Sequence, residues 1–379
     1  MVGLFDTFVV CIKLLYLLCT IKKISKFLVY FLNIIKILSA EQAIKIAAGE
    51  VVERPSHIIK ELIENSIDAH ATKITLLVEQ GGKKLIKIID NGIGMSADDA
   101  QLSVAAHATS KITCVEDLQT ITTFGFRGEA LAAINSVSNL TLTTKLDTID
   151  AGTQFSWNYG KLHTVTTVSH PTGTTIEITN LFGNIPARQK FLKKDETEWN
   201  AILILFQAFC FDYQTIHFQL YHNGKLYLNC PATRTLIDRV AQIFDTGLHD
   251  KIITLEKRSI GTYKISGVIG NHTYYRYDRN QIFIFVNNRW VKNIDLTKAI
   301  MRGYAGTLPA QKYPHALIFI TMDHAEVDIN IHPKKEEVKF LHPKKNRAVN
   351  HRNNKNRISK LINQSICYST KTSKCSLST

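Results

Sequence analysis

The chain has 379 residues, which is room for two domains of ordinary size. With 45% apolar and 21% charged residues, its composition is that of a soluble globular protein rather than a disordered or fibrous chain. The formal net charge is +14, but residues 343–379 carry +9 and residues 1–38 carry +4, so the body of the chain is nearly neutral. Charge therefore excludes a chain that binds nucleic acid along its whole length, and any such argument belongs to residues 208–342, which carry +5, and to the basic tail.

The seven cysteines are dispersed along the chain and include no CxxC pair and no Cys/His cluster with zinc-ligand spacing. An odd, scattered set of this kind is typical of reduced thiols in a cytoplasm. We expect no structural metal.

Residues 1–34 are rich in apolar side chains, which Asp6 and several lysines interrupt. No uncharged run reaches the roughly 18–20 residues that cross a bilayer, and no signal-peptide pattern is clear. Two interpretations stay open: a helix on a membrane surface, or an extension outside the fold that could even derive from an upstream start codon. We favour the extension and do not expect membrane association.

Hydrophobic periodicity and turn residues predict the elements that follow. In chain order they are a strand at 35–38, a helix at 39–55, a helix that contains 61–69, a hairpin at 73–92, a helix at 96–106 and a glycine-bearing loop at 122–131. Four strands come next, at 140–146, 153–160, 164–168 and 174–180, and then an amphipathic helix at 196–211.

That last helix divides the chain, and a second α+β unit is predicted to begin with residues 216–229 and to continue through 281–291 and 315–333. After Pro343 the sequence turns polar, which predicts a disordered tail or the start of a linker. The predicted domains are therefore 35–207 and 208–342, between the extension of residues 1–34 and the tail of residues 343–379.

The helix at 61–69, ELIENSIDA, has two contrasting sides. Apolar residues at helical spacing predict a core face, formed by Ile59, Leu62, Ile63 and Ile67. Glu61, Asn65 and Asp68 share the other side. Such a side is usually only solvated, but a carboxylate one turn from an amide oxygen also suits Mg²⁺ together with a water.

Four further motifs could meet a ligand, although each is weak alone. DNGIGM (90–95) places Asp90 at a strand end, before Gly92 and Gly94, which permit close approach of the backbone. HATSKI (107–112) offers hydroxyl groups and a lysine to phosphate oxygens. GFRGEAL (125–131) combines a glycine loop with a helix start, which can bind an anion, and GTTIEI (173–178) places Thr174 at a strand start.

The order of these motifs resembles the Bergerat-type (GHKL) ATP fold, which gyrase, heat-shock chaperones, histidine kinases and MutL share. The chain is most similar to the MutL family of DNA mismatch repair proteins, over roughly residues 35–342. The motifs that carry this resemblance are AAGEVVERP, KELIENSIDA, DNGIGM, HATSKI, TFGFRGEAL, IPARQKFL and DINIHPKKEEVKF.

The resemblance implies an α+β architecture, with a two-layer Bergerat-type ATPase domain followed by a smaller α/β domain of the ribosomal-protein-like fold. It implies that Glu61 is the general base and that Asn65 is the ligand of Mg²⁺. Asp90 would bind the adenine amine of ATP, with support from Gly92, Gly94 and Thr174. Thr109, Ser110 and Lys111 would approach the phosphates, and the lid would consist of Gly125, Phe126, Arg127 and Gly128. Lys335 would reach the γ-phosphate, with its neighbour Lys334 as the alternative.

The resemblance also implies slow, Mg²⁺-dependent ATP hydrolysis in a bacterial cytosol, and ATP-driven closure into a homodimer of this half. The implied partners are DNA, bound non-specifically through its backbone, a MutS-like mismatch-recognition protein, and a downstream nuclease or helicase. Arg276, Arg279, Arg289, Lys292 and Arg302 are candidates for the DNA contacts.

Family members continue into a C-terminal dimerisation domain, whereas this sequence ends at Thr379. We therefore expect no endonuclease domain here. The alternative functions are an ATP-gated DNA-binding module without useful turnover, and a chaperone or histidine kinase on the same ATP fold.

Overall fold

The computed structural model describes residues 52–106, 108–109, 128–244, 246–260, 263–323, 326–328, 339–340, 359–360, 362–367 and 369. The predicted extension, the strand at 35–38 and most of the helix at 39–55 lie outside these residues. The last residues of that predicted helix are not helical, since Val52 to Arg54 precede a separate helix that begins at Pro55.

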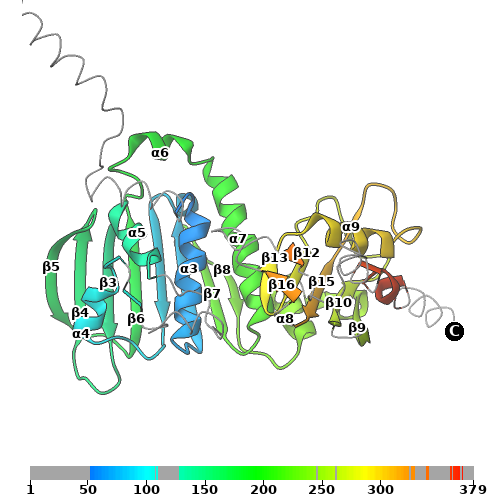
Figure 1. Cartoon of the computed structure of the whole chain (residues 1–379), viewed down its shortest axis with the longest axis horizontal. Coiled ribbons are helices and arrows are strands. Elements are labelled where there is room, and N and C mark those ends of the chain that lie inside the picture. Colours follow the sequence, from blue (N-terminus) through cyan, green and yellow to red (C-terminus); the bar gives the residue numbers. More distant parts are fainter. Residues whose placement is uncertain are drawn as a thin grey trace, which may run out of the picture. The chain divides into compact units, whose positions relative to one another are not determined.

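An eight-stranded sheet organises the first part of the described chain (Figure 1). Its strands are, in spatial order, β5 (Lys161–Val168), β4 (Gly152–Asn158), β3 (Asn139–Lys145), β6 (Gly173–Thr179), β2 (Leu85–Asp90), β1 (Lys73–Glu79), β7 (His217–His222) and β8 (Lys225–Cys230). Neighbours are antiparallel except for β1 and β7, which are parallel. Buried residues alternate along β1 and β2, as expected for a sheet with one face on the core.

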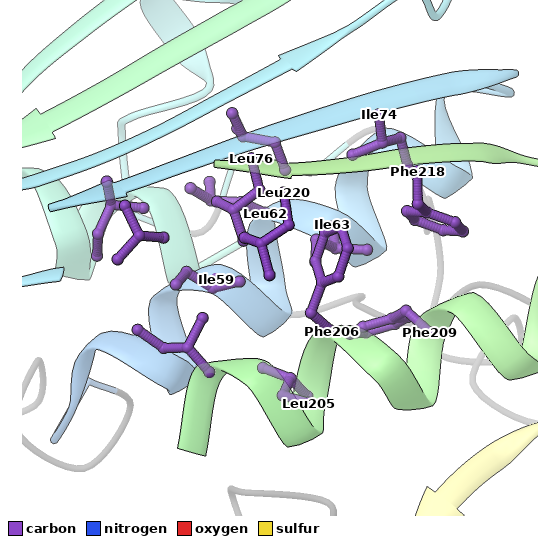
Figure 2. Close-up of a cluster of buried hydrophobic side chains, with 14 of the residues drawn as sticks. Ile59, Leu62, Ile63, Ile74, Leu76, Leu205, Phe206, Phe209, Phe218 and Leu220 are labelled. Carbon is purple, nitrogen blue, oxygen red and sulfur yellow. The ribbon is translucent and has the colours of Figure 1, made fainter. Parts of the chain in front are cut away.

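Helices cover that face and give two layers. They are α3 (Pro55–Asp68), α4 (Ala97–Leu102), α5 (Ala130–Ser136) and α7 (Asp195–Asp212). The short helix α6 (Pro186–Phe191) has no buried residue and precedes α7, and a 3₁₀ turn, η1 (Gln80–Gly82), lies between β1 and β2. Figure 2 shows α3 and α7 side by side, with Ile59, Leu62 and Phe206 turned toward the strands. The mixed α+β architecture predicted from the sequence is confirmed.

Helix α3 follows directly from its residues. Pro55 occupies the first turn, where its missing N–H costs no hydrogen bond. Ile59, Leu62 and Ile63 are fully buried and Ile67 is partly buried, so the predicted core face is confirmed.

Helix α7 differs from the amphipathic helix predicted at 196–211. Leu205 and Phe206 are buried, and so are all four residues from Ala208 to Phe211, which point in every direction around the axis. The cause is that α7 lies against α3 on one side, while Phe211 packs on Phe283 of a second sheet on the other. The helix is therefore apolar almost all round.

The second sheet has five strands in the order β13 (Arg289–Val291), β12 (Ile282–Val286), β15 (Ala316–Thr321), β10 (Tyr263–Gly270) and β9 (Ile252–Ile260). Helices α8 (Leu236–Ile243) and α9 (Ile294–Gly303) accompany it, together with a 3₁₀ turn, η3 (Thr246–Lys251). Two short ribbons pair β11 (Tyr275–Arg276) with β14 (Tyr313–Pro314), and β16 (Val327–Asp328) with β17 (Lys339–Phe340).

The predicted start of the second domain at residue 208 differs from the sheet topology. Residue 208 lies inside α7, and the hairpin predicted to open the second unit forms β7 and β8, which extend the first sheet beside β1. Sequence alone could not assign this hairpin, because its parallel partner β1 lies far back in the chain.

The predicted disordered tail also differs from the structure. The described residues among 359–369 are helical, and Ile362 and Ile366 are fully buried in the second core. Gly303 at the end of α9 lies directly against Ile366, so two apolar residues one turn apart anchor this segment. Within the described residues, no helix is both long enough and apolar enough to cross a membrane.

Candidate functional site

The site is centred on Asp90, the last residue of β2, which is only 8% exposed. Its Oδ1 accepts hydrogen bonds from the backbone N–H groups of Gly92 (2.9 Å) and Thr174 (3.3 Å). Its Oδ2 accepts a hydrogen bond from Ser66 Oγ of α3, at 2.9 Å. The carboxylate is thus fixed from three separate segments.

Burial raises the pKa of Asp90 above its ordinary value. The hydrogen bonds from Gly92, Ser66 and Thr174 act in the opposite direction, as does the charge of His170, and they offset only part of the effect. A buried carboxyl group that is held in place, and whose pKa is raised, is a candidate for a functional site.

A row of side chains crosses three neighbouring strands at this point. Asp90 of β2 pairs with Thr174 of β6, and Thr174 pairs with Thr144 of β3. The hydroxyl groups of Thr144 and Thr174 lie 3.1 Å apart, and Thr144 Oγ1 accepts a hydrogen bond from the N–H of Met95 at 2.9 Å. The polar row therefore also holds the loop that follows β2.

That loop, residues 91–95, is pressed against its surroundings. The N–H of Ile93 donates to the carbonyl oxygen of Ala69 at the end of α3. Gly94 has φ +73°, and a side chain there would overlap the carbonyl oxygen of Lys145. Only glycine fits this conformation and this space, which gives a physical reason for the D-x-G-x-G pattern.

Glu61 and Asn65 lie on the half-buried side of α3, one turn apart. Ser66 follows Asn65 directly and bonds to Asp90, so the turn that carries Asn65 lies against the strand end. Among the described residues, no group of three His, Cys, Asp or Glu side chains could hold a metal ion. A site with two oxygen donors still fits Mg²⁺, because that ion keeps several waters and takes phosphate oxygens as further ligands.

The other predicted site residues divide in two. Thr109 and Gly128 are described, and Gly128 lies in contact with Ala108, so the two flanks of segment 110–127 meet. The remaining ones lie outside the described residues; they are Ser110, Lys111, Gly125, Phe126, Arg127, Lys334 and Lys335.

Sequence reasoning missed Ser66 and Thr144, although both contact the predicted residues. For Ser66 a signal exists, because a serine among the buried Leu62 and Ile63 of the core face needs a partner. Thr144 sits in the strand run LTLTTK, where threonine is common for its strand propensity alone. Only the pairing of β3 with β6 gives it a role.

Comparison with known proteins agrees with this geometry. Residues 53–187 match the family described as "Histidine kinase-, DNA gyrase B-, and HSP90-like ATPase", and residues 240–366 match "DNA mismatch repair protein, C-terminal domain". Curated relatives include the DNA mismatch repair protein MutL of Acidobacterium capsulatum, 40% identical over 329 residues, or 81% of this chain and 50% of the relative. The MutL protein of Pasteurella multocida is 41% identical over 310 residues, again 81% of this chain and 50% of the relative.

Solved structures have the same fold. One described as the N terminal domain of a DNA repair protein has a TM-score of 0.72 at 22% identity and covers 88% of this chain and 99% of its own. The Aquifex aeolicus MutL ATPase domain complexed with ADP has a TM-score of 0.54 at 24% identity, with 72% of this chain and 93% of its own covered.

The chain spans about half the length of the curated relatives that it matches. The region that matches the ATPase family contains Asp90, Thr174 and most of the first sheet. The region that matches the mismatch-repair family follows it in the chain and contains the second sheet. The chain therefore belongs to the MutL family of DNA mismatch repair proteins, of which it represents the N-terminal ATPase half.

Proposed function

We propose that this chain binds ATP with Mg²⁺ at the Asp90 site, hydrolyses it slowly, and couples mismatch recognition to downstream repair through ATP-driven closure. The observation that carries the proposal is the fixed carboxylate of Asp90, held by Ser66, Gly92 and Thr174 at the end of β2. Oδ1 already accepts two hydrogen bonds and Oδ2 only the one from Ser66, so Oδ2 has acceptor capacity left for the exocyclic amine of adenine. The solved relative bound to ADP supports a nucleotide as the ligand.

In the proposed reaction, Glu61 takes a proton from the attacking water, and Asn65 contributes an oxygen to Mg²⁺. When bound there, Mg²⁺ would supply positive charge against the charge that develops during phosphoryl transfer. Lys335 is the cation proposed for the γ-phosphate, and Thr109, Ser110 and Lys111, with the lid from Gly125 to Gly128, are proposed to enclose the phosphates. Phosphoryl transfer needs mainly positioning and charge stabilisation, which such a set supplies.

The proposed first domain ends after Cys230, where the eight-stranded sheet ends, and the second domain follows. We place the protein in the bacterial cytosol, where its proposed partners are a MutS-like protein and a downstream nuclease or helicase. From the resemblance to the MutL family we also propose that two copies of this chain pair when ATP is bound.

Non-specific DNA binding is proposed for the basic second domain. Arg276 and Arg279 are exposed near the β11–β14 ribbon, and the Arg279 guanidinium lies 5.0 Å from the ring centre of Tyr313. Lys312 Nζ lies 3.2 Å from the ring centre of Tyr277, which is 79% exposed. Cations next to aromatic rings suit phosphates and unpaired bases, and such binding weakens steeply with salt.

The decisive experiment measures ATP turnover by the whole chain, with and without single-stranded DNA, beside Glu61→Ala and Asp90→Asn. We expect slow turnover that falls at least about 100-fold in Glu61→Ala, which still binds nucleotide, and loss of binding in Asp90→Asn. Glu196→Ala is the control, since Glu196 is an exposed acid in the first turn of α7. Nucleotide binding without turnover that depends on Glu61 would overturn the ATPase proposal.

A further inference from the structure

A pocket lies where helices α3 and α7 meet the β12–β13 hairpin of the second sheet. Charged groups and apolar side chains both line it: Lys60, Glu64, Leu205, Ala208, Phe209, Asp212, Phe285, Asn288, Arg289 and Trp290. The α3–α7 pair that forms one side of it is visible in Figure 2. The pocket lies outside the Asp90 site, and none of its residues belongs to the proposed nucleotide machinery.

Helix α3 connects this pocket to the proposed site. Lys60 and Glu64 are one turn apart and share the pocket side of the helix, while Glu61 and Asn65 follow them directly and share the next side. The helix buries its remaining side against the sheet. A shift at Lys60 or Glu64 is therefore passed to Glu61 and Asn65 through a single rigid helix.

The hairpin across the pocket is held firmly by the second sheet. Asn287 and Asn288 form its two-residue turn, both with positive φ. The backbone N–H of Asn287 donates to Ile320, and its side-chain oxygen accepts from the N–H of Met322. Arg289 and Trp290 follow the turn directly, so their position is fixed by the second domain.

Three carboxyl groups and two cations lie at the pocket or beside it: Glu64, Asp212, Lys60 and Arg289 line it, and Asp68 acts on the adjacent Tyr213. Glu64 is 4% exposed, and burial raises the pKa of Asp212 to about 8. Burial also raises the pKa of Tyr213. The negative charges of Asp212, Glu64 and Asp68 raise that pKa further, and the positive charge of Arg289 lowers it. The charged groups that line the pocket with Asp212 are Lys60 and Glu64 of α3 and Arg289 of the hairpin. With Asp212 neutral, the carboxylates of Glu64 and Asp68 are matched by the cations of Lys60 and Arg289.

We propose that Glu64, Asp212 and Arg289 form a junction through which the second domain positions α3, and with it Glu61, for ATP hydrolysis. This inference rests on the proposed ATPase function. The three are positioning residues, since they act through α3 and not on the nucleotide. Ionisation of Asp212 adds an uncompensated negative charge beside Glu64 and loosens the junction. When Asp212 ionises, the turnover of ATP therefore falls. ATP binding is retained, because it depends on the strand residues Asp90 and Thr174.

The test compares the pH dependence of turnover in the whole chain without DNA, for wild type, Asp212→Asn and Glu64→Gln. We expect wild-type kcat to fall about tenfold as pH rises through about 8, the pKa of Asp212, and Asp212→Asn to stay level. Glu64→Gln is expected to lower kcat about tenfold at pH 7 while nucleotide affinity changes less than twofold. Asp150→Asn, at an exposed acid in the turn before β4, is the control and should follow wild type.

The same pH profile for wild type and Asp212→Asn would overturn the junction. So would a Glu64→Gln variant whose nucleotide affinity falls as much as its kcat. If the wild-type protein shows no turnover that depends on Glu61, the ATPase proposal fails instead. The fluorescence of Trp290 then tests the junction without catalysis. In a Trp157→Phe, Trp199→Phe background, ATP must change the Trp290 emission of the parent protein but not of Glu64→Gln. An equal response in both would overturn the junction independently of catalysis.

Discussion

Gly94 occupies a position that combines a left-handed backbone with a crowded neighbourhood. Its φ is +73°, and a Cβ atom there would overlap the backbone of Lys145 at the end of β3. We predict that Gly94→Ala lowers the free energy of unfolding by about 3 kcal/mol, from the left-handed strain and the overlap together, and weakens nucleotide binding. Urea denaturation measures the first effect, and a fluorescent ATP analogue measures the second.

Gly224 is the matched control for this prediction. It has φ +77° in the β7–β8 turn, but nothing lies within 4 Å of the position that a Cβ atom would take. Gly224→Ala should therefore lower the free energy of unfolding by about 1 kcal/mol, from backbone strain alone, and leave nucleotide binding unchanged. Equal losses in the two variants would show that the overlap with Lys145 is relieved at no cost.

Ser66 tunes the carboxyl group at the centre of the site. Burial raises the pKa of Asp90, and the hydroxyl of Ser66 opposes this by donating to Oδ2. We predict that Ser66→Ala raises the pKa of Asp90 further, since the charged form loses a donor. An NMR titration of the Asp90 carboxyl carbon measures the shift, with Ser103→Ala, whose hydroxyl bonds to Ala100 instead, as the control.

The sign of the accompanying stability change follows from linkage. A carboxyl group whose pKa is raised on folding is stabilising only while it stays protonated, so its contribution falls as pH rises from the ordinary value of 3.8 to the raised one. Ser66→Ala widens the interval between the ordinary and the raised pKa of Asp90. The free energy of unfolding of this variant should therefore fall over a longer pH range than that of the wild-type protein. A pKa that stays the same in Ser66→Ala would contradict the role given to this hydroxyl.

The residues of the site were predictable to the extent that they carry a pattern of their own. Asp90 and Gly94 lie in a D-x-G-x-G motif after an alternating strand, and the structure gives each a physical reason. Ser66 carried only the signal that a serine on the core face needs a partner, and Thr144 carried none, because their roles arise from α3 packing on β2 and from β3 pairing with β6. Such contacts join residues that are distant in sequence.

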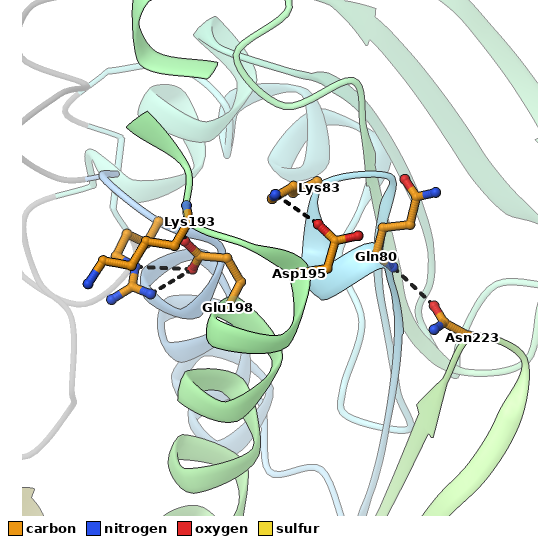
Figure 3. A network of polar contacts seen from close by, with 7 residues as sticks. Gln80, Lys83, Lys193, Asp195, Glu198 and Asn223 are labelled. Carbon is orange, nitrogen blue, oxygen red and sulfur yellow. Dashed lines mark hydrogen bonds and ion pairs between the residues drawn. The ribbon is translucent and has the colours of Figure 1, made fainter. Parts of the chain in front are cut away.

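Helices α3 and α7 are joined by a partly buried ion pair as well as by apolar packing. Glu198 of α7 is fully buried and accepts hydrogen bonds from Arg54, next to the start of α3, and from the N–H of Lys193. Figure 3 shows Glu198 and Lys193 in this network, with the Lys83–Asp195 ion pair nearby. The arginine thus connects the entrance of α3 to the first turn of α7.

Arg54→Ala should leave the Glu198 carboxylate buried and only partly compensated. We predict a loss of about 3–5 kcal/mol in the free energy of unfolding, measured by urea denaturation at pH 7. Lys84→Ala is the control, because the Lys84–Glu79 pair at 2.6 Å is largely exposed and should cost less than about 1 kcal/mol. If the two variants lose similar amounts, water reaches Glu198 and the buried pair does not join the helices.

Among the elements, local signals predicted most and long-range packing decided the rest. The hairpin at 73–92 is confirmed, because its pairing depends on residues that are close in sequence. The amphipathic character predicted for α7 is wrong, since the C-terminal half of the helix is buried all round, against α3 and against Phe283 of the second sheet. The helix around Ile362 and Ile366 was missed because its polar flanks dominate the composition there.

The two sheets share one continuous core, and this governs how the protein unfolds. Phe283, Phe285 and Leu317 of the second sheet belong to the same buried cluster as the core of the first sheet. Phe211 of α7 links the two, since its ring centre lies 5.1 Å from that of Phe283 and 5.6 Å from that of Phe244. Shared apolar surface of this kind makes one domain costly to unfold while the other stays folded.

We therefore predict a single cooperative unfolding transition for the described domains, observed at the same denaturant concentration by tryptophan fluorescence and by circular dichroism. Phe211→Ala should lower the free energy of unfolding by about 3–5 kcal/mol and separate the two probes. Fluorescence follows single tryptophans, Trp290 in the second sheet and Trp157 in the first, whereas circular dichroism follows the secondary structure of both sheets together. Phe155→Ala, which empties a buried position of β4 within the first sheet alone, should destabilise without separating them. Two transitions in the wild-type protein would show that the domains fold independently, and the second domain would then have no fixed platform from which to position α3.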